Sequence, residues 1–129
     1  MKTIPVFLVA LISFLFSSCN QRTDVWSEME EYHRLMSETY HPFEEGNMEP
    51  VNNKIDDLVN AAENWADSEP PASMEKEGMD QKLVDLKDET GKLSALINEN
   101  ADTETISAQF EDLHDLFHQI QETYSEEVH

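Results

Sequence analysis

Three histidines and two methionines are the side chains of this sequence whose types and spacing could do chemistry. His114 and His118 lie one helical turn apart, so their imidazoles can share one metal ion from a single helix face. His33 lies on an apolar stripe between Met29 and Met36, where its polar ring needs a partner. Imidazoles bind zinc or copper, and thioethers favour copper(I). We therefore predict a metal site built from these five residues.

Four amphipathic stripes must position these side chains. In each stripe apolar residues recur mainly at alternating intervals of three and four, which is typical of one face of a packed helix. The stripes cover residues 26–43, 51–65, 79–97 and 106–124. Hairpin signals are absent from the sequence, because it has only 3 glycines and no Asn-Gly or Asp-Gly pair. The sequence predicts an all-α fold, an antiparallel up-down-up-down four-helix bundle.

The breaks between the stripes predict the loops of the bundle. His41-Pro42 and Gly46 are expected to end the first helix, since a residue before proline avoids the helical region. Residues 68–77, with Pro70 and Pro71, form the longest expected loop. Asp102 or Thr103 is expected to cap the last helix.

An antiparallel pairing of the first and last helices brings the candidate ligands to one layer. This register places His33 level with Phe117 and His118, and Met36 level with His114. His41 lies roughly 12 Å beyond His33 along the helix at 1.5 Å per residue. We therefore expect His41 in the loop, outside the layer that holds the site.

The same histidines have a plainer interpretation. His33 would be a core histidine satisfied by a hydrogen bond, while His114 and His118 would face solvent beside the apolar stripe. The sequence leaves this alternative open.

The charge of the chain excludes some partners. It has 28 acidic and 8 basic side chains, and a net charge of −20. Such a chain repels nucleic acid and attracts cations or basic proteins, although the acidity also serves solubility. No nucleophile elbow or phosphate-binding glycine loop occurs, and adjacent acids such as Asp56 and Asp57 fit a solvated face. We expect no enzyme activity.

The first residues are typical of a secretory signal. Lys2 precedes an apolar stretch over 4–16, which is too short to cross a bilayer that needs about 20 helical residues. The residues before Cys19 resemble the lipobox of bacterial lipoproteins, with Phe16 where leucine is usual. The resemblance implies a signal peptide over 1–18, lipidation of Cys19, an anchor and tether over 19–24, and a bundle over 25–129. The protein would face the periplasm from a membrane of the cell envelope, with the outer membrane preferred.

Two further motifs resemble those of the four-helix cytochromes, the soluble b-type cytochrome and the cytochromes c-prime. Ser68-Glu69-Pro70-Pro71 is similar to the Pro-Pro loop of the b-type protein, and Phe117-His118-Gln119 to its haem-ligating motif. The resemblance covers about 26–124 and implies non-covalent haem with His118 as an axial ligand. The methionine ligand of that family falls on Tyr32, beside His33, so the match is inexact. Covalent haem is excluded because the sequence has 1 cysteine.

These observations lead to two functional hypotheses. The first is a lipid-anchored periplasmic protein that binds copper, zinc or haem without catalysis. The second is an acidic interaction or scaffold lipoprotein that has no cofactor and binds a basic partner. In both cases the lipid attaches the chain to a membrane.

Overall fold

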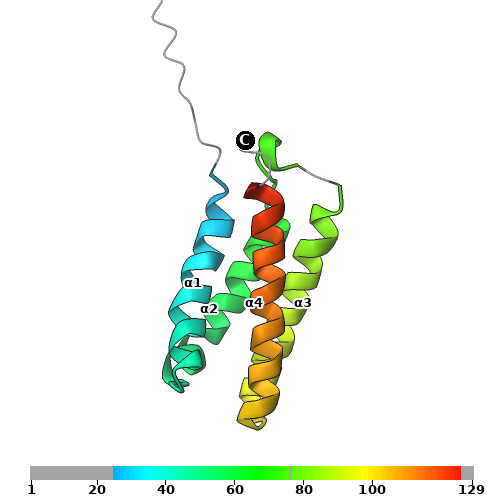
Figure 1. Ribbon diagram of the computed structural model, residues 1–129. Coiled ribbons are helices and arrows are strands. Elements are labelled where there is room, and N and C mark those ends of the chain that lie inside the picture. The colour runs from blue at the N-terminus through cyan, green and yellow to red at the C-terminus, as the bar shows by residue number, and fades with distance from the viewer. Residues whose placement is uncertain (1–24, 76, 126–129) are drawn as a thin grey trace, which may run out of the picture.

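The computed structural model describes residues 25–75 and 77–125 and consists of four α-helices and a short 3-10 helix. The elements are α1 (Ser27–Glu44), α2 (Glu49–Asp67), η1 (Ala72–Met74), α3 (Met79–Asn98) and α4 (Thr103–Ser125) (Figure 1). Consecutive helices pack antiparallel, which confirms the predicted all-α up-down bundle. The predicted signal peptide over 1–18, Cys19 and the tether lie outside the described residues.

The helix ends follow the local sequence, with one correction. α1 continues through His41 and Pro42 to Glu44, so the expected break at His41-Pro42 is wrong. Pro42 lies in the last turn, where its missing N–H removes only one bond from a helix that is about to end. Gly46 then adopts a φ of +87°, and Asn47 N–H donates to the Pro42 carbonyl. At α4, Asp102 Oδ1 accepts from Thr105 N–H at 2.8 Å, which confirms the predicted cap.

An aromatic cluster fills one part of the core. Trp65 of α2 lies 5.7 Å from Trp26, 5.6 Å from Tyr32 and 6.1 Å from Phe117 between ring centroids. All four rings are buried, and they come from α1, α2, α4 and the residue before α1. Such contacts add to the free energy gained by burying the rings. The cluster therefore ties three helices together.

Tyr32 takes the core position that the stripe assigned to His33. Tyr32 is fully buried and its hydroxyl contacts Thr90 Oγ1 of α3 at 3.0 Å, while His33 is only half-buried. The buried face of α1 is broader than one heptad stripe, because it also includes Leu35 and Thr39. His33 consequently lies at the edge of this face.

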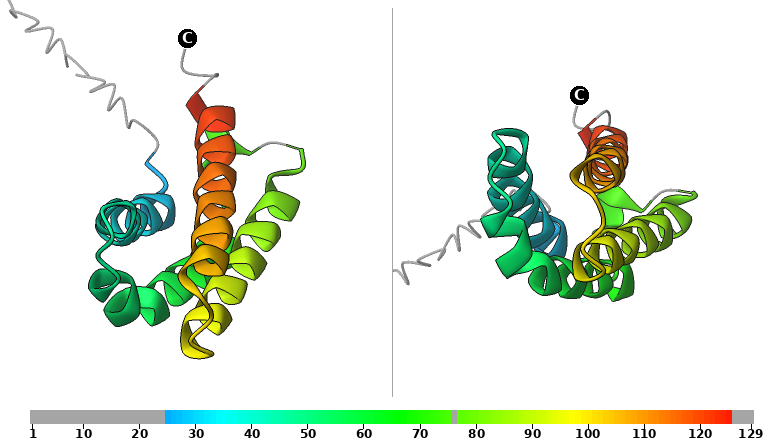
Figure 2. Two further views of the ribbon diagram at one scale, coloured as in Figure 1. Left: turned by 60° about the horizontal axis from the view of Figure 1, so that its bottom comes forward. Right: turned by 90° about the horizontal axis from the view of Figure 1, so that it is seen from below.

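The backbones of α1 and α4 lie farther apart than those of the other neighbouring helices. α1 packs along α2, α2 along α3 and α3 along α4, whereas α1 and α4 meet mainly through ring contacts such as that of Tyr40 with Phe110. Both views in Figure 2 show α1 and α4 standing apart. Among the described helices none is long and apolar enough to cross a membrane.

Candidate metal centre between α1 and α4

A groove of about 190 Å³ lies between α1 and α4 and contains most of the predicted ligands. One face of each helix lines it: residues 33, 36, 37, 40 and 41 recur at helical spacing, as do 114, 117 and 118. The lining side chains are His33, Met36, Ser37, Tyr40, His41, His114, Phe117 and His118. The fold thus brings four imidazoles and one thioether to the same hollow.

Two of these imidazoles are already in contact. The Nε2 atoms of His114 and His118 lie 3.1 Å apart, with one ring donating to the other. His114 is half-buried and His118 is exposed, so the pair lies at the mouth of the groove. With metal–nitrogen bonds of about 2.0 to 2.1 Å, this separation corresponds to an angle of about 100° at a shared ion. The two nitrogens therefore have the separation that two ligands of one ion would have.

Stacking holds two of the four imidazoles, His33 and His114, against aromatic rings from the facing helix. His114 stacks on Tyr40 with ring centroids 4.0 Å apart and an interplanar angle of 13°. His33 stacks on Phe117 at 5.2 Å and 28°. The second contact confirms the predicted antiparallel register, in which His33 lies level with Phe117. Stacking limits the rotation of each ring and so directs its nitrogens.

The surroundings of His114 favour its neutral imidazole. Partial burial and the neighbouring His118 lower the pKa of His114, although Asp115 and Glu44 oppose the shift. Burial, together with the negative charges of Glu44, Glu111 and Asp115, raises the pKa of Tyr40. Neutral imidazole is the form that coordinates a metal, and the surrounding carboxylates attract cations.

The structure separates the two predicted methionines. Met36 is 2% exposed and lines the groove, whereas Met29 is 5% exposed and is not one of the lining residues. Their positions on α1 explain the difference, because Met36 is one turn from His33 toward Tyr40, beside His114. Met36 is thus the thioether that the fold offers to a ligand in the groove.

His41 is the groove residue that the sequence interpretation missed. We expected it in a loop outside the site, but α1 extends past it and it lines the groove. Its Nδ1 lies 3.3 Å from Glu44 Oε2. The signal that could have found it is its position two turns from His33, on the same helix face.

Within 25–75 and 77–125, no group of three or more His, Cys, Asp or Glu side chains is arranged to hold a metal ion.

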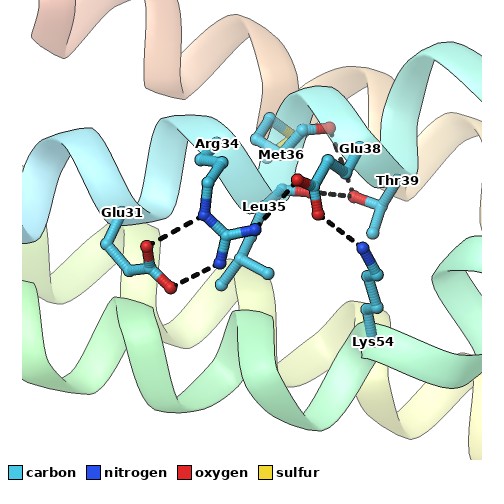
Figure 3. A network of polar contacts seen from close by, with 7 residues as sticks. All are labelled: Glu31, Arg34, Leu35, Met36, Glu38, Thr39 and Lys54. Carbon is cyan, nitrogen blue, oxygen red and sulfur yellow. Dashed lines mark hydrogen bonds and ion pairs between the residues drawn. The ribbon is translucent and has the colours of Figure 1, made fainter.

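Two larger surface hollows are not lined by any imidazole. One, of about 640 Å³, lies at the loop between α2 and α3 and is lined largely by carboxylates. The other, of about 360 Å³, lies between α1 and α2 beside Arg34. The guanidinium of Arg34 is already held by Glu31 and Glu38 (Figure 3). The groove between α1 and α4 therefore remains the better candidate for a metal site.

Comparison with protein-family models, curated proteins and solved structures finds no significant match for this chain.

Proposed function

We propose that this protein binds a transition-metal ion in the groove between α1 and α4, with His114 and His118 as the primary ligands. The observation that carries the proposal is the 3.1 Å contact between their Nε2 atoms. Two imidazoles one turn apart on a helix chelate an ion with little loss of conformational entropy, because the helix already holds them in place. His33, His41 and Met36 line the same groove and are the side chains available to complete the coordination.

The size of the groove favours an ion over haem. Pockets for drug-sized ligands have volumes of about 300 Å³ or more, and haem is larger than most such ligands. The groove measures about 190 Å³, and the His33 and Phe117 rings stack across it. Haem would have to separate these rings and move α1 away from α4. We therefore propose a metal ion, and not haem, as the ligand of the groove.

We also propose where in the cell the protein holds the ion. The chain would be a lipoprotein anchored through Cys19 and facing the periplasm, where it stores, senses or passes on the ion without catalysis. This part rests on the sequence motif that ends at Cys19. Mass spectrometry of the mature amino terminus tests it. A diacylglycerol-modified Cys19 is expected, and an unmodified terminus or a start at another residue would refute it.

The test of metal binding is titration of the tag-free full chain with Zn²⁺, Co²⁺ and copper. All variants carry Cys19→Ser, so that the single thiol does not compete with the groove for the ion. His114→Gln and His118→Gln should each reduce affinity by at least about tenfold, since even outer-shell changes cost 10- to 100-fold. Gln81→Ala is the matched control, because Gln81 is exposed on α3 and contacts only Asp85 in its hydrogen bond.

Equal affinity in the parent and in both histidine variants would overturn the proposal. Absence of binding for every metal would also do so. It would favour the competing function, an acidic interaction protein in which the histidines are incidental. Binding that is lost equally in Gln81→Ala would place the ion away from the groove.

A further inference from the structure

We infer that the groove selects a soft, singly charged ion, copper(I), and that Met36 supplies the third ligand. This inference rests on the proposed function and specifies the ion and its donor set. The two closest donor atoms in the groove are the Nε2 nitrogens of His114 and His118. The buried donor that lines the same groove is the Met36 thioether. Thioether sulfur selects copper(I), whereas zinc sites use Cys, His, Asp and Glu.

The exposure of the three proposed ligand side chains decreases from the mouth of the groove to its floor. His118 is exposed, His114 is half-buried and Met36 is 2% exposed. An ion held by the His114 and His118 pair would meet the Met36 side chain on its inner side. Methionine has three rotatable bonds and a polarisable sulfur, so it adapts to such a site without moving the helix.

The residues around the floor of the groove favour a monovalent ion over a divalent one. Met36, Tyr40 and Phe117 are buried, and they line the groove beside the imidazoles. Moving an ion from water into such surroundings costs free energy that rises steeply with charge. A monovalent ion therefore loses less hydration free energy than a divalent ion on reaching the thioether. The acidic residues Glu44, Glu111 and Asp115 lie close enough to influence Tyr40, and they offset the remaining positive charge.

The chain provides a matched pair of substitutions for the test. Met36 and Met29 are both buried methionines of α1, but only Met36 lines the groove. Leucine has nearly the volume of methionine, so both Met→Leu variants should fold. Each variant, in the Cys19→Ser full chain, is titrated anaerobically with Cu⁺ against a coloured chelator, with Ag⁺ as a redox-stable probe, and with Zn²⁺. The methionine methyl NMR signals are followed during the Ag⁺ titration.

Met36→Leu should weaken Cu⁺ and Ag⁺ binding by at least about tenfold and leave Zn²⁺ binding unchanged. Met29→Leu should bind all three ions like the parent. In the parent, Ag⁺ should shift the Met36 methyl signal and leave that of Met29 in place. Unchanged Cu⁺ and Ag⁺ affinity in Met36→Leu, with binding still lost in His114→Gln, would overturn the thioether assignment while the proposed metal site stands. If His114→Gln and Met36→Leu both bind like the parent, the proposed function itself fails.

Discussion

Helix α1 packs closely along α2 but leaves a groove toward α4, so one helix carries both a well-packed and an open face. Toward α2, Lys54 reaches Glu38, and Glu38 also binds Arg34 (Figure 3). Toward α4, Tyr40 and Phe43 contact Phe110, while His33 and His41 line the groove and are half-buried and exposed, respectively.

We interpret this difference as a division of α1 into a face that stabilises the fold and a face that carries the candidate site. The long interface of α1 with α2, and the Tyr32 to Thr90 contact between α1 and α3, help to hold α1 in place. On the α4 side, buried rings close the core where Tyr40 and Phe43 contact Phe110. Half-buried positions at the edge of this seam, such as His33, can be polar without a large loss of folding free energy. Three predictions test this division, in order of decreasing effect.

The largest effect should come from the aromatic cluster around Trp65. Trp65→Ala removes a fully buried ring that contacts Trp26, Tyr32 and Phe117, so it should reduce the free energy of unfolding by about 3 to 5 kcal/mol. His33→Ala should lose only a small part of that amount, because His33 is half-buried. Urea unfolding followed by circular dichroism measures both. Similar losses in the two variants would show that the groove side also holds the bundle together.

A smaller effect should appear in the pH dependence of the metal-free protein. The pKa of His114 is lowered in the folded state, chiefly by burial and then by His118. In the unfolded chain His114 has a pKa of about 6.5, so it becomes protonated as the pH falls below that value. In the folded state His114 remains neutral over the same pH range, because its pKa is lower. Stability should therefore fall with decreasing pH until the folded pKa of His114 is passed, and remain level below it.

His114→Gln should remove this part of the pH dependence, and His118→Gln should reduce it by removing one cause of the shift. The measurement is the urea midpoint at several pH values between about 5 and 8. A steeper fall with acid in His114→Gln than in the parent would contradict the assigned direction of the pKa shift.

The smallest effect should come from the ion pair of Lys54 with Glu38, which joins α2 to α1. Their side chains are 38% and 37% exposed, and such partly exposed pairs contribute little after solvent screening. Glu38→Gln, Lys54→Met and the double variant should therefore unfold at the parent's urea midpoint, at low and at high salt. A loss as large as that of Trp65→Ala would mean that charge, and not apolar packing, fastens α1 to α2.

Much of the fold could be predicted because it depends on local patterns. The heptad spacing predicted all four helices, the prolines predicted the long loop before α3, and Asp102 was predicted as a cap. The helix end at His41-Pro42 was wrong, since a local rule on proline does not include the support that α1 receives from its neighbours. Helix ends depend on such tertiary contacts more than helix interiors do.

Less of the candidate site could be predicted. The register of α1 against α4 was correct, as the His33 to Phe117 stack shows, and it placed His114 and His118 beside α1. A single apolar stripe does not reveal that α1 packs against two neighbouring helices and so buries a broader face. The sequence interpretation therefore put His33 in the core in place of Tyr32. For the same reason it could not separate Met36 from Met29, and the misplaced end of α1 left His41 out of the predicted site.

The aromatic cluster described above also gives the molecule an optical probe. The chain has 2 tryptophans, Trp26 and Trp65, and both are buried in that cluster. The Trp26 indole N–H donates to Ser68 Oγ at 2.8 Å, whereas Trp65 Nε1 has no hydrogen-bond partner among the described residues. Emission should therefore be blue-shifted in the folded state, with Trp65 contributing the bluer component, and should move to longer wavelength when the cluster opens. Phe117 belongs to this cluster and also lines the groove, so a signal from the imidazoles is needed to tell an opening of the cluster from a change in the groove alone.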